Sequence, residues 1–472
     1  MDQALAKQDA KTILYTPSML GVVGRGVLCP CVPLVFIEAS AFPRASKQRL
    51  HLWGRQQLRS PRVTGVEVML GPTLHTLEKA SQSEGLRAEY ANELVRRAKA
   101  MHNAKAPVVF TLMHLAHLSG SPWQRLHQCV KRTRDPYSTF EVRKKSGGNR
   151  RICVPAPFLK RTQAWIHQNI LCSSGALALI HDASTAYADK CSAHKNALRH
   201  AGASWMIKLD IKDFFESISE RQVYHIYRSL GYPALLAFEM ARLSTRYLDQ
   251  SWADTVPLRQ GRWRWSAADP GKGVPYAKPY QVGHLPQGAP TSPMLANLVV
   301  RAMDADISAI ASTAGATYTR YADDIVLSLG WCTRATAVAL LRAVGEVVTK
   351  AGFRINRKKT HVRGPGARKV VTGLTINDAK PRLPRSLKDE VELALFNIEK
   401  HGLLGHMERK RSKDPLGYLS HLQGVLLYAR QIEPEFADAA LASMRRILVP
   451  YAEFLDVFRT FRPEPGTDYM FA

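Results

Sequence analysis

Residues 317–328 have the sequence Thr-Tyr-Thr-Arg-Tyr-Ala-Asp-Asp-Ile-Val-Leu-Ser, in which two adjacent acids separate two runs of β-branched and aromatic residues. Runs of this kind favour β-strands, so we expect a hairpin with Ala322-Asp323-Asp324 at its turn. Two neighbouring carboxylates repel each other unless a cation neutralises them, and carboxylate oxygens suit Mg²⁺. The segment therefore predicts a magnesium site at the tip of a hairpin.

A third acid lies in an apolar segment upstream. Residues 205–215 have the sequence Trp-Met-Ile-Lys-Leu-Asp-Ile-Lys-Asp-Phe-Phe, which predicts a strand that carries Asp210. On a neighbouring strand, this carboxylate would complete a site for two Mg²⁺ ions about 3.5–4 Å apart, the arrangement used for in-line phosphoryl transfer. Asp213 would face the opposite side of such a strand, so we expect it to be structural.

A turn-rich loop lies between the two acidic segments. Residues 285–293 have the sequence Leu-Pro-Gln-Gly-Ala-Pro-Thr-Ser-Pro, and Pro293 is suited to opening a helix. In this order, the three segments resemble the palm motifs of reverse transcriptases. The resemblance implies an α+β right-hand polymerase with fingers and palm, in which the palm is an antiparallel sheet plus helices, and a helical thumb. A small helical N-terminal module would precede this core.

The resemblance also implies which residues serve the chemistry. The two Mg²⁺ ions would be held by Asp210, Ile211, Asp323 and Asp324, with the three acids also counted as catalytic. A lysine in residues 356–360, Asn-Arg-Lys-Lys-Thr, would protonate the departing pyrophosphate, and we assign this role to Lys359. The alternative for this basic segment is a solvated surface.

The same resemblance implies contacts with the incoming dNTP. Phe215 would lie beneath its sugar and exclude a 2′-hydroxyl, while Gln287 and Gly288 would pack over the nucleotide and the template base. Gly288 would permit a close backbone approach.

Residues 140–152 predict a hairpin with a basic tip, because Gly147-Gly148 is a turn signal. From this hairpin, Lys145 and Arg150 would bind the triphosphate. Strand register decides between these two and their neighbours Lys144 and Arg151, and the sequence does not fix that register.

Two further motifs narrow the resemblance. Asn196-Ala197-Leu198-Arg199-His200 lies before the first acidic strand, and Val371-Thr372-Gly373 follows Lys359. An Asn-Ala-x-x-His and a Val-Thr-Gly at these places are similar to those of bacterial retron reverse transcriptases. The RNA-binding residues implied are Asn196, His200, Val371, Thr372 and Gly373.

Retron enzymes bind a structured noncoding RNA, prime from the 2′-hydroxyl of an internal guanosine, and make a branched RNA–DNA hybrid called multicopy single-stranded DNA. They commonly act in antiphage defence with a separate effector protein. The resemblance thus implies four kinds of partner, namely a cognate noncoding RNA, its RNA–DNA product, dNTPs and an effector.

Alternatives remain open at this point. The chain could be a group II intron-like or other bacterial reverse transcriptase. It could also be a non-catalytic RNA-binding scaffold of a toxin–antitoxin assembly, although such a scaffold would tolerate loss of the acids. For the retron motifs, Asn196 could cap a helix, His200 could fill a polar niche, and Val-Thr-Gly could be a strand with a bulge.

Composition is consistent with a nucleic-acid partner. The 472 residues include 66 Lys+Arg against 39 Asp+Glu, a net charge of +27, which predicts a polyanionic partner. Seven irregularly spaced cysteines form neither a zinc pattern nor a disulfide framework, which favours a reducing cytoplasm. No apolar stretch is long enough to span a membrane, so we expect no membrane partner.

The expected domain organisation has four parts. Residues 1–68 form a basic, poorly ordered extension, which either binds nucleic acid or lies upstream of a true start at Met69. Residues 69–131 form the helical module, 132–384 the fingers and palm, and 385–472 the thumb and tail. Within the core we expect helices at about 158–171 and 293–312, strands at 353–362 and 369–376, and a polar insertion at 249–284.

Overall fold

The computed structural model describes residues 88–143, 147–188, 191–247, 283–410 and 414–451. The expected basic extension, Lys144, Lys145 and most of the expected insertion lie outside these ranges. Among the described residues, no helix has both the length and the apolar character needed to cross a bilayer.

An antiparallel sheet lies at the centre of the chain. Its strands are β3 (Trp205–Lys212), β4 (Thr317–Tyr321), β5 (Asp324–Leu329), β6 (Arg354–Ile355) and β7 (His361–Arg363). The strand order is β4-β5-β3-β6, and β7 also pairs with β3. The expected hairpin is thus confirmed as β4 and β5, and β3 lies directly beside it.

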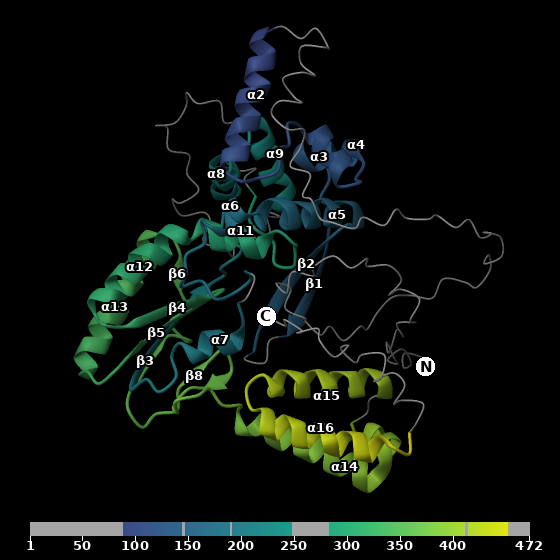
Figure 1. Cartoon of the computed structure of the whole chain (residues 1–472), viewed down its shortest axis with the longest axis vertical. Coiled ribbons are helices and arrows are strands. Elements are labelled where there is room, and N and C mark those ends of the chain that lie inside the picture. Colours follow the sequence, from purple (N-terminus) through teal and green to yellow (C-terminus); the bar gives the residue numbers. More distant parts are fainter. Residues whose placement is uncertain (1–87, 144–146, 189–190, 248–282, 411–413, 452–472) are drawn as a thin grey trace, which may run out of the picture.

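Helices cover the sheet because its apolar side chains need a second layer. Helices α11 (Ser292–Val299), α12 (Arg301–Thr313) and α13 (Arg334–Lys350) lie along it, as Figure 1 shows. Strand residues Ile207 and Leu327 are fully buried in one core with Leu298 and Val344 of these helices. This core fixes the strands whose ends carry the acids.

A second, two-stranded sheet forms the expected hairpin. It consists of β1 (Tyr137–Arg143) and β2 (Asn149–Pro155), with Arg143 paired to Asn149 at its far end. The other helices that precede α11 are α2 (Ala88–Asn103), α3 (Leu112–Leu118), α4 (Trp123–Val130), α5 (Pro157–Trp165), η2 (Ile166–Leu171), α6 (Ser174–Leu177), α7 (Ala193–Leu198), α8 (Glu220–Ser229) and α9 (Ala234–Ser244) among the described residues.

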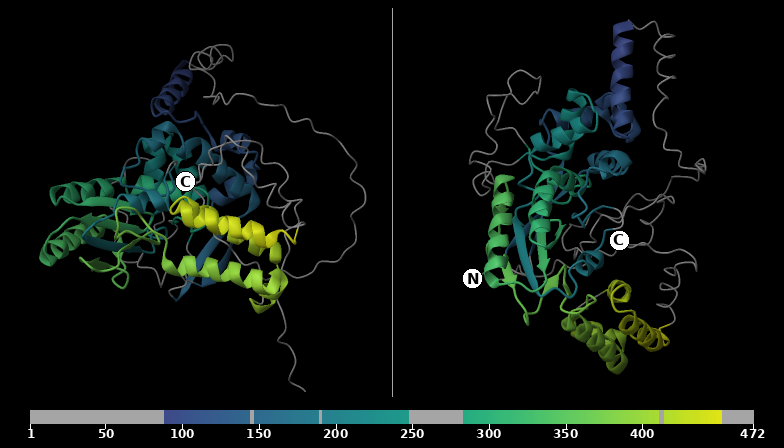
Figure 2. Two further views of the ribbon diagram at one scale, coloured as in Figure 1. Left: turned by 60° about the horizontal axis from the view of Figure 1, so that its bottom comes forward. Right: turned by 60° about the vertical axis from the view of Figure 1, so that its left-hand side comes forward.

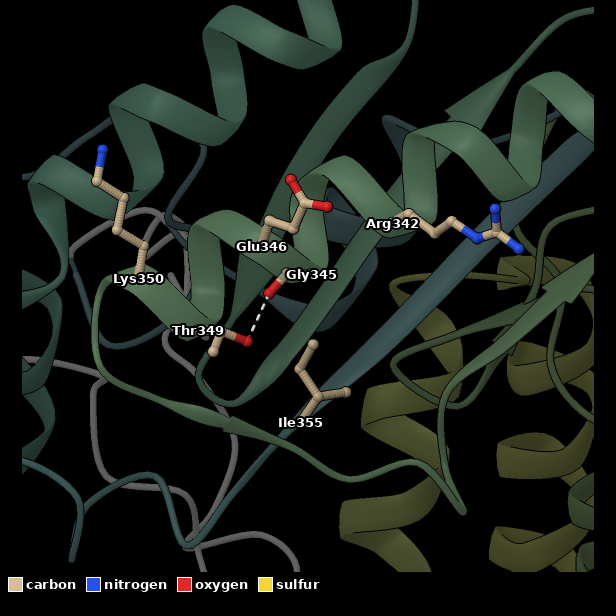
Figure 3. A pocket seen from close by; sticks show the side chains of 6 residues that line it. All are labelled: Arg342, Gly345, Glu346, Thr349, Lys350 and Ile355. Carbon is tan, nitrogen blue, oxygen red and sulfur yellow. Dashed lines mark hydrogen bonds between the residues drawn. The ribbon is translucent and has the colours of Figure 1, made fainter. Parts of the chain in front are cut away.

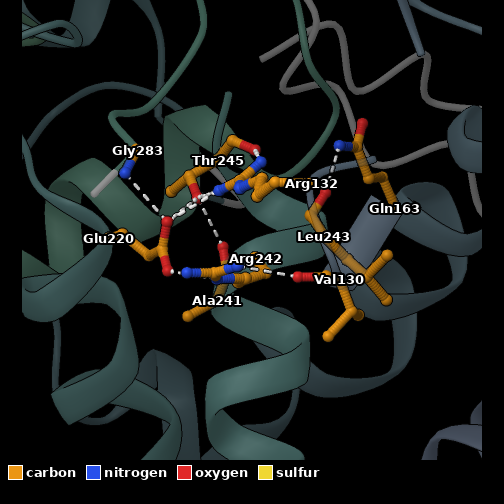
Figure 4. Close-up of polar contacts among 9 residues, drawn as sticks. All are labelled: Val130, Arg132, Gln163, Glu220, Ala241, Arg242, Leu243, Thr245 and Gly283. Carbon is orange, nitrogen blue, oxygen red and sulfur yellow. Dashed lines mark hydrogen bonds and ion pairs between the residues drawn. The ribbon is translucent and has the colours of Figure 1, made fainter. Parts of the chain in front are cut away.

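One buried carboxylate joins the N-terminal helices to this core (Figure 4). Glu220, the first residue of α8, is fully buried and accepts from Arg132 at 2.6 Å and from Arg242 at 3.0 Å. It also accepts from the backbone N–H of Gly283 at 2.9 Å. A buried charge without such partners would be strongly destabilising, so the cluster fixes the relative positions of these segments.

The C-terminal helices have a core of their own. They are α14 (Arg385–Arg409), α15 (Pro415–Arg430) and α16 (Pro434–Leu448), and they lie at the opposite end of the molecule from α2 (Figures 1 and 2). A small hairpin of β8 (Val370–Val371) and β9 (Leu374–Thr375) connects them to the sheet. Val371 packs in one cluster with Ala429 and Ala437 of the C-terminal helices.

Several elements differ from expectation. The helix expected at 293–312 is two helices, because Val300 leaves helical geometry (φ −90°, ψ 5°). The helix expected at 158–171 becomes a π-helix from Ile166. The strand expected at 353–362 is two short strands, β6 and β7, separated by residues 356–360. The strand expected at 369–376 is the hairpin of β8 and β9, because Thr372 and Gly373 turn the chain with φ of 46° and 86°. Asp213 lies beyond β3 with φ 49°, so it is not on the strand's opposite face.

Candidate active site

Strand register brings the three acids together. Asp210, near the end of β3, pairs with Asp324, the first residue of β5. Asp323 directly precedes Asp324 and lies in a tight turn in which Ala322 has φ 58°. The backbone N–H of Ile211 donates to the carbonyl of Asp323 at 2.9 Å, which ties this turn to β3. Three carboxylates from two adjacent strands therefore lie at one edge of the sheet.

The carboxylates strongly influence one another. Burial raises the pKa of Asp323 to about 6, and the neighbouring charges of Asp324 and Asp210 add to this shift. A cation bound beside these carboxylates would favour the charged form of Asp323 and lower its pKa. The site is thus arranged to attract positive charge.

Lysines compensate two of the acids in this structure. Lys359 Nζ lies 2.8 Å from Asp210 Oδ2, and this contact raises the pKa of Lys359. Lys208 Nζ lies 2.8 Å from Asp324 Oδ2, and Asn356 Nδ2 donates to Asp210 Oδ1 at 2.9 Å. The contacts of Lys208 and Asn356 were not foreseen from the sequence. Strand alternation could have identified Lys208, which shares a face with Asp210.

The donor set fits magnesium by its chemistry. Three carboxylates and the backbone oxygen of Ile211 are the hard oxygen ligands that Mg²⁺ prefers. Within the described ranges, no group of three or more Asp, Glu, His or Cys side chains is arranged closely enough to hold a metal ion.

The residues expected to contact the nucleotide come from three elements. Phe215 follows β3, with its ring 5.5 Å from that of Phe214 and 6.2 Å from that of Tyr187. Gln287 accepts from the N–H of Cys153 on β2 at 2.7 Å through its carbonyl. Gly288 has φ 112°, and a Cβ there would lie 2.9 Å from the carbonyl oxygen of Cys153. The loop therefore needs glycine to pack against the β1–β2 hairpin.

The hairpin itself carries Arg150 exposed on β2, while Arg151 is half-buried. Burial raises the pKa of the Tyr187 hydroxyl, the negative charge of Asp323 adds to this shift, and the positive charge of Arg150 opposes it. Lys145 lies outside the described residues, so its predicted contact stays a prediction.

Asn196 and His200 are buried under the sheet. Thr319 of β4 donates to Asn196 Oδ1 at 2.7 Å and lies 2.6 Å from His200 Nε2. The only proton of Thr319 Oγ1 is used by Asn196, so His200 Nε2 donates and its Nδ1 accepts from Ser328 Oγ at 2.7 Å. Both side chains are almost completely inaccessible. In this arrangement they support the sheet, and direct contact with RNA would require them to be exposed.

The Val371-Thr372-Gly373 segment is a hairpin turn rather than a bulged strand. Val371 is buried, Thr372 Oγ1 donates to the carbonyl of Ala193 at 2.7 Å, and Gly373 is exposed. A Cβ at Gly373 would meet nothing within 4 Å. Of the five residues predicted to bind RNA, Gly373 is thus the one that the fold leaves open to a ligand.

A shallow groove between α13 and β6 is separate from this site (Figure 3). Its lining residues are Arg342, Gly345, Glu346, Thr349, Lys350 and Ile355. None of the three carboxylates contributes to it, and we assign it no function.

Comparison with known proteins identifies the family of the chain. A family model described as reverse transcriptase (RNA-dependent DNA polymerase) matches residues 142–370, which include all three acids. The retron Mx162 reverse transcriptase of Myxococcus xanthus is 31% identical over 340 residues, 69% of this chain and 63% of that protein. The retron Ec73 reverse transcriptase of Escherichia coli is 30% identical over 316 residues, 65% of this chain and 86% of that protein.

The chain therefore belongs to the reverse transcriptases and, among them, to the retron family. It spans 63% and 65% of the length of the two M. xanthus relatives, the retron Mx162 and Mx65 enzymes. A solved telomerase from Candida albicans in complex with a fragment of telomeric RNA aligns with a TM-score of 0.33 and 11% identity. That alignment covers 71% of this chain and 68% of the telomerase, and we draw no argument from it.

Proposed function

We propose that the protein is an RNA-directed DNA polymerase that adds dNTPs by nucleotidyl transfer at Asp210, Asp323 and Asp324. The observation that carries this proposal is the register that sets Asp210 opposite Asp324, with Asp323 fixed at the adjoining turn. Two Mg²⁺ ions, when bound there, would activate the primer hydroxyl and stabilise the leaving pyrophosphate. The carbonyl of Ile211 would be a further ligand.

The remaining residues would position the nucleotide. Lys359, whose ammonium group lies 2.8 Å from Asp210 Oδ2, would give a proton to the leaving pyrophosphate. Arg150 and Lys145 would bind the triphosphate from the hairpin. Phe215 would exclude the ribose 2′-hydroxyl, while Gln287 and Gly288, anchored on β2, would pack over the base.

We further propose a retron activity on a cognate structured noncoding RNA. The enzyme would prime from a guanosine 2′-hydroxyl and produce a branched RNA–DNA hybrid in the cytoplasm, as part of antiphage defence with a separate effector. Gly373 would contact the RNA directly, while the buried Val371 and the hydrogen-bonded Thr372 would hold this turn in place. Asn196 and His200 would contribute indirectly by supporting β4 and β5.

A two-template assay tests this proposal. The wild-type protein should extend an annealed DNA primer on a generic RNA, and should start synthesis without a primer on its partner RNA. Gly373→Asn adds a side chain in open space and still permits a left-handed backbone, so it should block only the second reaction. Gly315→Asn, at a matched open glycine with φ 63°, is the control.

The outcomes separate the alternatives. No extension of either template would contradict the polymerase assignment and favour a non-catalytic scaffold. Extension of the annealed primer without self-initiation would indicate another kind of bacterial reverse transcriptase. Equal losses on both templates for Gly373→Asn would remove the recognition role of the turn.

A further inference from the structure

The loop Ala183–Tyr187 is bound to the strand that leads into the catalytic turn. Arg320 of β4 donates its N–H to the carbonyl of Ala183 at 2.7 Å, and its own carbonyl accepts from the N–H of Thr185 at 2.9 Å. The carbonyl of Ala186 accepts from Asn297 Nδ2 of α11 at 2.7 Å. The loop therefore cannot move independently of β4 and α11.

One fully buried guanidinium joins this loop to the acids. Arg320 Nη1 donates to Asn297 Oδ1 at 3.0 Å and to the carbonyl of Ala322, in the catalytic turn, at 3.1 Å. The same side chain forms a double contact with Asp304 at 2.8 and 2.7 Å. The positions of the turn and of Asn297, which holds the loop, are thus set by the same group.

Tyr187, at the end of this loop, reaches the proposed sugar gate. Its backbone has φ 69°, a conformation that is unfavourable for a tyrosine and is maintained here by the bonds on the preceding residues. Its ring lies 6.2 Å from the ring of Phe215, with an interplanar angle of 49°. Phe215 also has a ring contact with Phe214, which is buried in the core.

We propose that Tyr187 is a positioning residue that fixes the ring of Phe215 and thereby sets how well the enzyme excludes ribonucleotides. The substrate class concerned is the incoming nucleoside triphosphate, distinguished by its sugar. A gate that rejects one hydroxyl by contact works only if its ring cannot move aside, because the added group is small. Tyr187 supplies a ring contact to Phe215 in addition to the contact from the buried Phe214.

This inference rests on the proposed polymerase function, and its test keeps the two apart. Single-nucleotide incorporation is measured with dNTP and with the matching rNTP on one primed RNA template, and selectivity is the ratio of the two kcat/KM values. The variants are Tyr187→Phe, Tyr187→Asn, Phe215→Ala and the double variant Tyr187→Asn/Phe215→Ala. Asparagine is chosen because it tolerates the left-handed backbone.

We expect Tyr187→Asn to lower selectivity by about three- to tenfold, the range of one aromatic contact. Tyr187→Phe keeps the ring and should retain selectivity. If Tyr187 acts through Phe215, the double variant should be no less selective than Phe215→Ala alone, since the two losses are not additive. The exposed Tyr247, changed to Ala, is a control that should keep wild-type selectivity.

A purely structural role would slow incorporation of both nucleotides and leave their ratio unchanged in Tyr187→Asn, and that result would overturn the inference. Multiplicative losses in the double variant would also overturn it. A wild-type protein that incorporates neither nucleotide would contradict the proposed function itself, and full selectivity in Phe215→Ala would remove the gate on which the inference depends.

Discussion

His200 illustrates what a single buried residue contributes. It sits between Thr319 and Ser328 on adjacent strands, with both ring nitrogens hydrogen-bonded, and burial lowers its pKa to about 4. The Asn-Ala-x-x-His motif identified this residue, but no local pattern showed that its ring lies within the sheet. Only the packing of α7 against β4 decides that, and such long-range contacts are not encoded by neighbouring residues.

The titration of His200 gives a pH prediction. Between pH 6.5 and about 4, the unfolded chain binds a proton at this histidine that the folded chain does not, so the free energy of unfolding falls as pH falls through this window. His200→Gln lacks this contribution. Its loss of stability between pH 7 and pH 4.5 should be smaller than that of the wild type by about 2 kcal/mol.

Urea unfolding at both pH values measures this difference. His117→Gln, at an exposed helix position, is the control and should follow the wild-type pH dependence. If the free energy of unfolding of the wild type and of His200→Gln falls by the same amount from pH 7 to pH 4.5, the folded protein does not hold a buried neutral imidazole at this position.

At the scale of elements, local signals were sufficient for some features and not for others. The hairpin at Asp323 and the strand at Asp210 followed from propensity and turn chemistry, which depend on neighbouring residues. Their register, which sets Asp210 opposite Asp324, could not be derived from the sequence alone. The same holds for the break at Val300 and for the contacts of Lys208 and Asn356, which depend on distant segments.

The Arg320–Asp304 ion pair joins β4 to α12, so we expect its loss to lower the stability of the fold. Both side chains are fully buried, so Arg320→Met leaves an uncompensated carboxylate and should lower the free energy of unfolding by about 3–5 kcal/mol. The double variant Arg320→Met/Asp304→Leu removes both charges and should recover part of this loss. Urea unfolding of the single and double variants measures the coupling, and strictly additive losses would show that the pair is not coupled.

At the scale of the whole molecule, composition predicted the type of partner and little else. A net charge of +27 predicts a polyanion, and membership of the retron family agrees with RNA. The separate core of α14, α15 and α16 agrees with the expected helical C-terminal part, while the exact domain boundaries stay predictions. Neither charge nor fold specifies which RNA is bound, because that depends on a few side chains at the surface.

DNA synthesis by a variant without the two hairpin acids tests the central claim most directly. The wild type should extend a DNA primer on RNA in the presence of Mg²⁺. Asp323→Asn/Asp324→Asn keeps the size of both side chains, so the fold and RNA binding should be retained. Without two of the three carboxylates, the rate should fall by about a thousandfold or more. Undiminished dNTP incorporation by this variant would contradict the assignment of the active site.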